Sequence, residues 1–403
     1  MGLIEQADEL FARQALHEAV SLYEKASLEL PFEPDPLPRF HAVIQAIKCY
    51  SYLQDEDKKS HFAVRAASEV QLVNNFEMRA NIAHVLGNVT FETGLIPAAV
   101  EFFQTAIFLY GKLENFVRQS EVLLDYRAVL EHIGDWQGVY NALQIVAENL
   151  HNVSKFSTVW GKYFLNKGRI EAFILGNSDK GENIFEDLYQ LLARADPSGY
   201  MGWCLGNIAL LKLETGQFFD ALRLSGRVSW IARINQNIPL FLLAQEIFIL
   251  ALKAEGRFQE SKYAAEWVLA TYNGPNRIRM LTAKMRGMCG ETESAVELFH
   301  EVIAVAEKRK ALWEEFITKI WLTDLYVSSD NIDKGKEIGE GVVKMLEIIT
   351  ERFKLPLRDE FLERNTDIKT FRKLIEKLNI KSFFIKEAKE FLFNEPNDKS
   401  YFV

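Results

Sequence analysis

The sequence predicts an all-helical chain built from repeated helix pairs, and three observations point to this fold class. The chain has 403 residues, more than a single core of roughly 250 to 300 residues accommodates. Glycine and proline, which punctuate short strands and tight turns, are scarce at 22 and 10 copies. A turn followed five, nine and twelve residues later by small or apolar side chains recurs along the chain. An array of stacked helices satisfies all three observations.

Six segments carry the repeat, and each predicts a helix that begins just after a short break. Their turns lie at Gln14, Gly94, Gly134, Gly216, Gly256 and Gly290. Successive turns are 40 residues apart from 94 to 134 and from 216 to 256, and 34 apart from 256 to 290. The intervals 14–94 and 134–216 each hold two units, and weaker units are predicted around 55, 177–181 and 330. The spacing therefore predicts about nine helix pairs.

Small side chains mark the places where the two helices of a pair meet, because helices approach closely only where side chains are short. In the second helices these positions are Ala19, Ala99, Ala221 and Ala295. In the first helices, seven residues before the turn, they are Ala7, Gly87, Ala209 and Ala283. Larger residues four positions after the alanines fill the space toward the next pair, namely Tyr23, Phe103 and Phe299. Since no pair buries its apolar face alone, the pairs must stack.

These positions resemble the tetratricopeptide repeat (TPR). The first unit carries the pattern as Ala7, Ala19, Tyr23, Ala26 and Pro31. A later unit carries it as Leu86, Gly87, Gly94, Ala99, Phe103 and Ala106, and a third as Ala209, Gly216 and Ala221. The resemblance covers roughly residues 1 to 350 and implies a right-handed α-solenoid, a superhelix whose inner groove is lined by the first helices. The common period near 40 is longer than that of the family, and in this the chain is similar to helical sensor domains of bacterial signal-responsive regulators.

The units at Gly134 and Gly256 depart from the TPR pattern, because Arg127 and Ile249 stand where a small residue is expected. We expect looser or shifted helix packing there. The proline-rich segment 31–38 predicts a bend, and the polar segment 176–183, with two glycines, predicts a flexible loop. We therefore expect N-terminal repeats over 1–175, C-terminal repeats over 184–350, and capping helices with a tail over 351–403. As an alternative to capping, the end of the chain is a docking helix anchored by Phe383, Phe384, Phe391 and Phe393.

Composition and motifs exclude several classes of function. A net charge of −9 disfavours a broad phosphate-binding surface, so no direct nucleic-acid partner is expected. The three cysteines, an odd number without CxxC spacing, predict free thiols rather than a disulfide framework or a zinc site. Phosphate-binding glycine loops and the HExxH and GxSxG motifs are absent from the sequence. The sequence thus predicts a protein that is not an enzyme and needs no metal or cofactor.

Nothing in the sequence indicates a membrane or secreted protein. The first residues are acidic where a secretory signal is basic. The most apolar run, 238–254, is interrupted by Gln245, Glu246 and Lys253 and is shorter than the roughly 20 apolar residues that a membrane span needs. We expect a cytoplasmic protein without a membrane partner.

Candidate ligand-binding residues follow from the TPR resemblance, which implies that polar side chains near the small residue of the first helix hold a bound peptide. His84 and Asn88, three residues before and one after Gly87, occupy such positions. The same helix face in later units carries Arg127, Glu131, Lys162, Asn166, Arg169, Trp203 and Asn207. Cations, amides and an indole suit a peptide, or alternatively a small polar ligand. The structural alternative is a solvated helix face and, for Asn207, an internal hydrogen bond.

The function predicted from this pattern is a non-catalytic scaffold that binds a protein or peptide in assembly or signalling. The alternative is a ligand-sensing module of a bacterial transcription-control system. That module needs a separate DNA-binding partner, because no helix-turn-helix reader is recognisable among the repeats.

Overall fold

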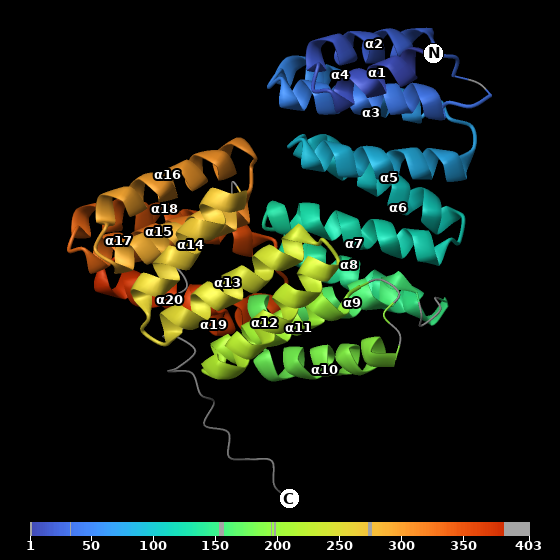
Figure 1. Cartoon of the computed structure of the whole chain (residues 1–403). Helices are drawn as coiled ribbons and strands as arrows, with labels where there is room; N and C mark the ends of the chain where they lie inside the picture. The colour runs from blue at the N-terminus through green and yellow to red at the C-terminus, as the bar shows by residue number, and fades with distance from the viewer. Residues whose placement is uncertain are drawn as a thin grey trace, which may run out of the picture. The chain divides into compact units, whose positions relative to one another are not determined.

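The computed structural model describes residues 2–32, 34–152, 157–194, 196, 199–272 and 276–382. These residues form helices and turns and contain no strand (Figure 1). Within the described residues, consecutive hairpins are formed by α1–α2, α3–α4, α5–α6, α11–α12, α13–α14, α15–α16 and α17–α18, and α10 packs against η2; α19 and α20 follow α18. The all-helical TPR-like array predicted from the sequence is confirmed. None of the described helices is both long and apolar enough to span a membrane.

The chain divides into two compact units. The first comprises residues 1–133 and 138–159, and the second comprises residues 134–137 and 160–403. The predicted boundary at 176–183 falls inside the second unit. The helices of the first unit are α1 (Leu3–Ala12), α2 (Leu16–Glu29), α3 (Leu37–Tyr52), α4 (Glu56–Val70), α5 (Phe76–Glu92), α6 (Ile96–Lys112), α7 (Phe116–His132), α8 (Trp136–Asn149) and the 3₁₀ turn η1 (Leu150–Asn152). The first two residues of α8, 136 and 137, are assigned to the second unit.

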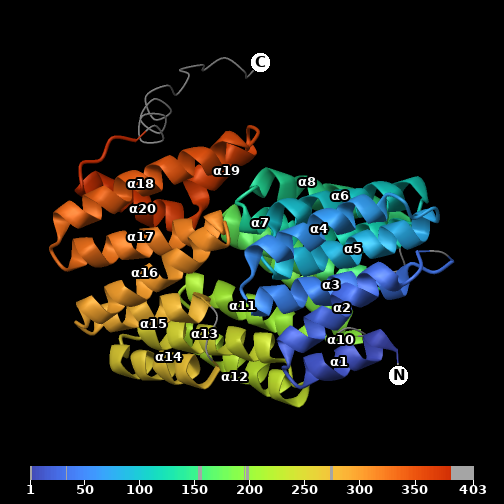
Figure 2. The same cartoon turned by 90° about the horizontal axis from the view of Figure 1, so that it is seen from above.

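The second unit carries the remaining hairpins, which follow one another from α11 to α18 in Figure 2. Its helices are α9 (Thr158–Arg169), η2 (Ile170–Ile174, a π-helical turn), α10 (Ser178–Arg194), α11 (Met201–Glu214), α12 (Phe218–Ile234), α13 (Ile238–Ala254), α14 (Phe258–Tyr272), α15 (Asn276–Met288), α16 (Thr292–Lys308), α17 (Leu312–Ser328), α18 (Ile332–Glu351), α19 (Leu357–Arg364) and α20 (Thr366–Lys377).

The turns that the repeat predicted are present in the structure. Glycine occupies the left-handed region at positions 94, 134, 216, 256 and 290, with φ between 71° and 85°. Glycine adopts this conformation without the steric cost that a Cβ imposes. Where the sequence lacks glycine, a polar residue takes the same conformation, as at Gln14, Gln54 and Asp330. A single backbone geometry therefore closes strong and weak repeats alike.

The small residues predicted at the helix contacts are fully buried. Ala7, Ala19, Ala99, Ala209, Ala221, Ala283 and Ala295 all have 0% exposure. At Gly87 the contact is so close that an added Cβ would lie 3.1 Å from the Phe103 ring. Ile249, which replaces a small residue, is also fully buried, against Ala265 and Met285. A small residue on the facing helix thus offsets the extra volume of Ile249.

The polar segment 176–183 is not the flexible loop that its composition suggested. Helix α10 begins at Ser178, so only residues 175 to 177 separate it from η2. Asn365 at the start of α20 donates to the carbonyl oxygens of Phe173 and Ile174, at 3.1 and 3.0 Å. A side chain at Gly176 would collide with the Arg364 backbone, since its Cβ would lie 2.4 Å from the carbonyl oxygen. These contacts hold the turn against α19 and α20.

The end of the array is covered by α20, which contacts α17 and α18. Its apolar residues Ile368, Phe371, Leu374 and Ile375 are buried, so the helix shields the last hairpin as a capping element does. The alternative docking anchors Phe383, Phe384, Phe391 and Phe393 lie outside the described residues.

Candidate ligand-binding surface

The first helices of four successive hairpins in the second unit lie side by side. Helix α11 contacts α13, α13 contacts α15, and α15 contacts α17. We call the surface formed by these four helices the first-helix surface. Because residues seven apart lie two turns apart on the same helix face, each helix can present two side chains to this surface. Charged and aromatic residues occupy such spacings at Glu246 and Lys253, Arg277 and Lys284, and Glu314 and Trp321.

Trp321 on α17 is the centre of a cluster on this surface. Its side chain is largely buried, and two cations of α15, Arg277 and Lys284, lie over its ring. The Lys284 Nζ atom is 4.2 Å from the ring centroid, and the Arg277 Cζ atom is 4.9 Å from it. Both distances are within the range of cation–π attraction. Arg277 also donates from Nε to Glu246 Oε1 of α13 at 2.8 Å. We call Glu246, Lys253, Arg277, Lys284, Trp321 and Asp324 the charged cluster.

Two lysines of the charged cluster, Lys253 and Lys284, are brought together from adjacent helices. Burial, and secondarily the positive charge of the neighbouring Lys253, lower the pKa of Lys284 to about 8, although Asp324 and Asp367 partly oppose this shift. Burial also lowers the pKa of Lys253, against the attraction of Asp324. In the described ranges, no carboxylate lies within 4.0 Å of either ammonium group. The two lysines are therefore partly desolvated cations with no ion-pair partner in the part of the chain that the structure describes.

Glu214 ends α11 and adds an acidic group to the first-helix surface. Its surroundings raise the pKa of the carboxyl to about 7, mainly through desolvation and secondarily through the negative charge of Asp367. Near neutral pH this side chain therefore exchanges between the neutral and the charged form. The surface thus holds basic and acidic side chains with shifted pKa values, and a bound ligand can change their protonation.

The residues predicted in the first unit are engaged with one another or with neighbouring helices. His84 Nε2 on α5 lies 2.8 Å from Asp125 Oδ2 on α7, and its ring lies 6.0 Å from that of Phe103. Arg127 forms an ion pair with Glu131 one turn along α7. Asn88 is half-buried on the same helix as His84. The sequence did not indicate Asp125, which lies 41 residues from His84.

The residues predicted in the second unit include two amides with internal partners. Asn166 donates to the carbonyl oxygen of Lys162 at 2.7 Å, and Asn207 donates to that of Trp203 at 2.7 Å. The structural alternative considered for Asn207 is thus present. Arg169 is exposed at the end of α9, whereas Trp203 packs partly buried against two apolar clusters. A ligand-binding role for the nine predicted residues stays a prediction.

The charged cluster lies on the continuation, beyond Asn207, of the helix face that the sequence predicted. The positions used for His84 and Asn88, three before and one after the small residue, identify it when they are applied further along the chain. Glu246 lies three residues before Ile249, and Lys284 lies one residue after Ala283. In the unit whose turn is at Asp330, the position seven residues before the turn is 323, and Asp324 lies one residue after it. The signal was therefore present in the sequence.

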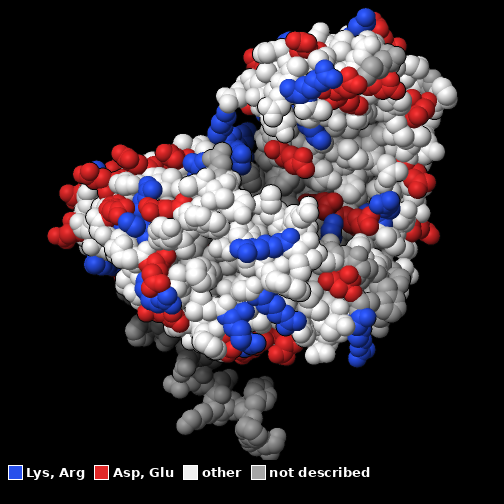
Figure 3. Space-filling view, in the orientation of Figure 1, with Lys and Arg blue, Asp and Glu red and all other residues white. Residues whose placement is uncertain are grey.

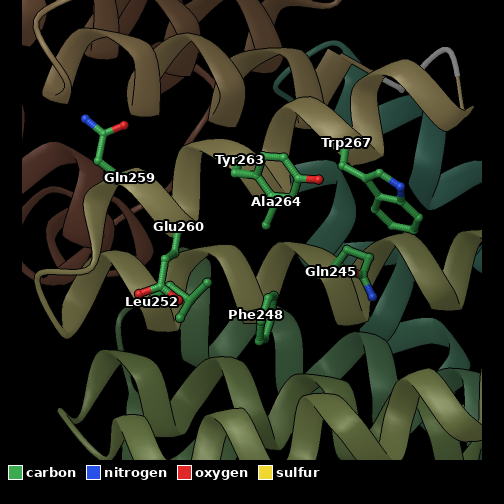
Figure 4. A pocket seen from close by; sticks show the side chains of 8 residues that line it. All are labelled: Gln245, Phe248, Leu252, Gln259, Glu260, Tyr263, Ala264 and Trp267. Atoms are coloured by element: carbon green, nitrogen blue, oxygen red, sulfur yellow. The ribbon is translucent and has the colours of Figure 1, made fainter.

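A pocket of about 470 Å³ opens between α13 and α14 (Figure 4). Its walls include three partly exposed aromatic side chains, Phe248, Tyr263 and Trp267, and its remaining lining residues are Gln245, Leu252, Gln259, Glu260 and Ala264. Gln245 and Leu252 each precede a cluster residue by one position. They are therefore turned by about 100° around α13 from Glu246 and Lys253. The pocket and the charged cluster occupy different faces of the same helix.

The described residues show no arrangement suited to a bound metal or a disulfide. No group of three or more His, Cys, Asp or Glu side chains among them converges on a metal-sized site. Cys49, Cys204 and Cys289 are free thiols, and the first two are buried. Burial raises the pKa of the Cys49 thiol to about 11 and that of Cys204 to about 12. Acidic and basic side chains are interspersed over the face shown in Figure 3.

Comparisons with known proteins find only distant structural similarities. No protein-family model matches the sequence, and no curated protein matches it. The chain is similar to the crystal structure of a Rap protein complexed with competence and sporulation factor, with 12% identity and a TM-score of 0.42, over 96% of this chain and 98% of that chain. It is also similar to yeast Tom70, with 13% identity and a TM-score of 0.35, over 96% and 98% of the two chains. Likenesses this distant carry no argument about function, and the TPR-like architecture rests on the helices, turns and small-residue contacts of the chain itself.

Proposed function

We propose that this protein is a non-catalytic scaffold that binds a protein or peptide segment along the first-helix surface of its second unit. The observation that supports the proposal is the charged cluster. Three cations, two carboxylates and an indole share one surface, and the two lysines have no ion-pair partner among the described residues. Desolvated charges without partners weaken a folded protein. Their presence is explained if a ligand supplies the missing partners.

A peptide or protein segment suits this surface better than a compact ligand. The surface extends over four packed helices, so it matches an extended chain that makes several separate contacts. Carboxylates such as Glu246 and Asp324 can accept hydrogen bonds from backbone N–H groups, and lysines can donate to side chains or carbonyl oxygens. A preformed helical scaffold binds without ordering much of its own chain, which limits the entropic cost of association.

The proposal is tested by selecting binders from a random peptide library against the full-length protein and measuring their affinity by calorimetry. The test variant carries Lys253→Gln, Arg277→Gln and Lys284→Gln. The matched control carries Arg223→Gln, Lys308→Gln and Lys336→Gln, which remove the same charge from exposed positions of the second helices α12, α16 and α18. We expect the test variant to lose roughly tenfold or more in affinity and the control to lose little. Equal affinity of the selected peptides for wild type and test variant would reject the first-helix surface as the binding site.

A further inference from the structure

We infer that Lys253 and Lys284 form a carboxylate-binding subsite that holds an aspartate or glutamate side chain of the bound segment. The inference rests on the proposed function and names the chemistry of one part of the ligand. The subsite is defined by the two ammonium groups, with the Trp321 ring beneath Lys284.

The first argument is the pairing of two donors that cannot satisfy each other. Lys253 near the end of α13 and Lys284 near the end of α15 come from helices that contact each other, and the charge of Lys253 acts on Lys284. An ammonium group has three donors and no acceptor, so two charged lysines repel and leave their protons unpaired. A carboxylate has two oxygens with about four acceptor sites and can bridge both groups. A ligand carboxylate would therefore convert a repulsive contact into two charge-assisted hydrogen bonds.

The second argument is that the other cation of the cluster is already engaged. Arg277 donates to Glu246 at 2.8 Å. Arg277 lies at the beginning of α15 and Glu246 in the middle of α13, whereas Lys253 and Lys284 lie near the ends of these helices. Trp321 supports Lys284 from one side at 4.2 Å. The indole attracts the ammonium but offers no lone pair, so the donors of Lys284 stay available. Lys253 and Lys284 are thus the pair with free capacity for an anion.

The third argument concerns the charge of the ligand group. The charged groups that face Lys284 are Lys253, Arg277, Asp324 and Asp367. The two aspartates attract the lysines but lie beyond ion-pair distance of their ammonium groups in the described residues. They also repel any bound anion, and the repulsion grows with the charge of that anion. A singly charged carboxylate is therefore favoured over a doubly charged phosphate.

Binding of a carboxylate must be coupled to protonation of the subsite. The ligand favours the charged form of Lys284, so its pKa rises in the complex. In the free protein that pKa is about 8. Affinity is therefore highest below about pH 8 and falls as the pH rises through that value, because binding then requires uptake of a proton.

The experiment uses the full-length protein and a hexaglutamate peptide blocked at both ends, so that only side-chain carboxylates are available. Hexaglutamine and inorganic phosphate serve as comparison probes. Each lysine is acetylated with limiting acetic anhydride and its rate is read by mass spectrometry. We expect hexaglutamate to slow acetylation of Lys253 and Lys284 several-fold, with Lys308 and Lys336 unchanged. Lys253→Gln and Lys284→Gln should each remove the protection of the remaining lysine.

Three results would overturn the inference. Unchanged acetylation of both lysines at saturating hexaglutamate would show that no carboxylate binds there. Equal protection by hexaglutamine would show that charge is not recognised, and stronger protection by phosphate would replace carboxylate with phosphate as the ligand group. If library-selected peptides bind the first-helix surface but hexaglutamate gives no protection, the subsite is wrong and the proposed function stands. If the selected peptides bind the variant with Lys253→Gln, Arg277→Gln and Lys284→Gln as tightly as wild type, the proposed function is rejected independently of the subsite.

Discussion

The Lys284 ammonium group lies 4.2 Å from the centre of the Trp321 ring, on a helix next to the one that carries Lys253. This arrangement is unfavourable for the free protein, because both lysines are partly desolvated and carry the same charge. Residues that weaken a fold while presenting unsatisfied donors are typical of binding sites. The charged cluster is therefore expected to lower the stability of the free protein and to bind a ligand, and the two effects can be measured separately.

Lys284→Gln is predicted to stabilise the free protein. The folded-state pKa of Lys284, about 8, lies below its ordinary value of 10.5. The cost of burying the charge is therefore fully present below about pH 8 and decreases as the pH rises toward 10.5. We expect the variant to gain about 1 kcal/mol near pH 7, or roughly 2 to 4 °C in Tm, and less near pH 10. Thermal unfolding at both pH values checks this; a variant that is less stable near pH 7 would contradict it. Lys308→Gln, at an exposed position, is the control.

Glu69→Gln is predicted to destabilise the first unit. Glu69 accepts from Arg39 at 2.8 Å and from Arg65 at 2.8 Å, and its side chain is only 13% exposed. Burial alone would raise its pKa, but the hydrogen bonds from the two arginines outweigh burial and lower it. We expect a loss of about 2 to 3 kcal/mol, measured by urea unfolding near neutral pH.

The same pKa shift sets the pH dependence of this loss. The stabilisation by Glu69 is present above the ordinary glutamate pKa and disappears as the pH falls through its lower folded-state value. The difference between wild type and Glu69→Gln should therefore shrink in acid. Glu101→Gln, at an exposed position of α6, should change stability little at any pH. A difference that stays constant into strong acid would show that the carboxylate charge is not responsible.

Ala99→Leu is predicted to disrupt the hairpin of α5 and α6. Ala99 is fully buried on α6, which packs against α5, and the three carbon atoms that leucine adds would overpack this buried position. We expect a loss of about 1 to 3 kcal/mol in urea unfolding from overpacking. Glu101→Leu places the same side chain on an exposed position two residues away and should cost much less. Equal losses would indicate that the small residue does not set the helix contact.

Glu214→Gln is predicted to change stability in a pH-dependent way. The folded-state pKa of about 7 exceeds the ordinary value of 4.5, so the folded state weakens as the pH rises from about 4.5 to 7. Glutamine resembles the neutral acid and should match wild type near pH 4.5. Near pH 8 the variant should be more stable by less than about 1 kcal/mol, because the side chain is exposed to solvent screening. Unfolding curves that coincide at every pH would show an ordinary Glu214 pKa.

The local parts of the fold were predictable from the sequence because they depend on residues close together in the chain. Gly94 and Gly134 mark turns through their backbone freedom, and Ala99 marks a helix contact through its size. Contacts between side chains on different helices could not be predicted in the same way. The partner of His84 is Asp125, 41 residues away, and nothing in the local pattern of α5 identifies it.

Composition alone was misleading where a long-range contact fixes a polar segment. The residues after Gly176 suggested a flexible loop, but Asn365 and Arg364 from α19 and α20 hold this turn in place. Asn207 in an apolar helix signalled a buried amide but not whether its partner was a ligand or the carbonyl of Trp203. Spacing rules locate a side chain on a helix face, whereas its partner depends on how neighbouring helices are placed.

The most direct test of the account is to identify which lysines contact the acidic groups of a bound segment. A library-selected peptide containing glutamate is joined to the full-length protein with a zero-length carbodiimide, which couples a carboxylate only to an amine in contact with it. Digestion and mass spectrometry then locate the bond. The account predicts coupling to Lys253 or Lys284, lost when both are replaced by glutamine. Coupling confined to lysines elsewhere, such as Lys308 or Lys336, would contradict it.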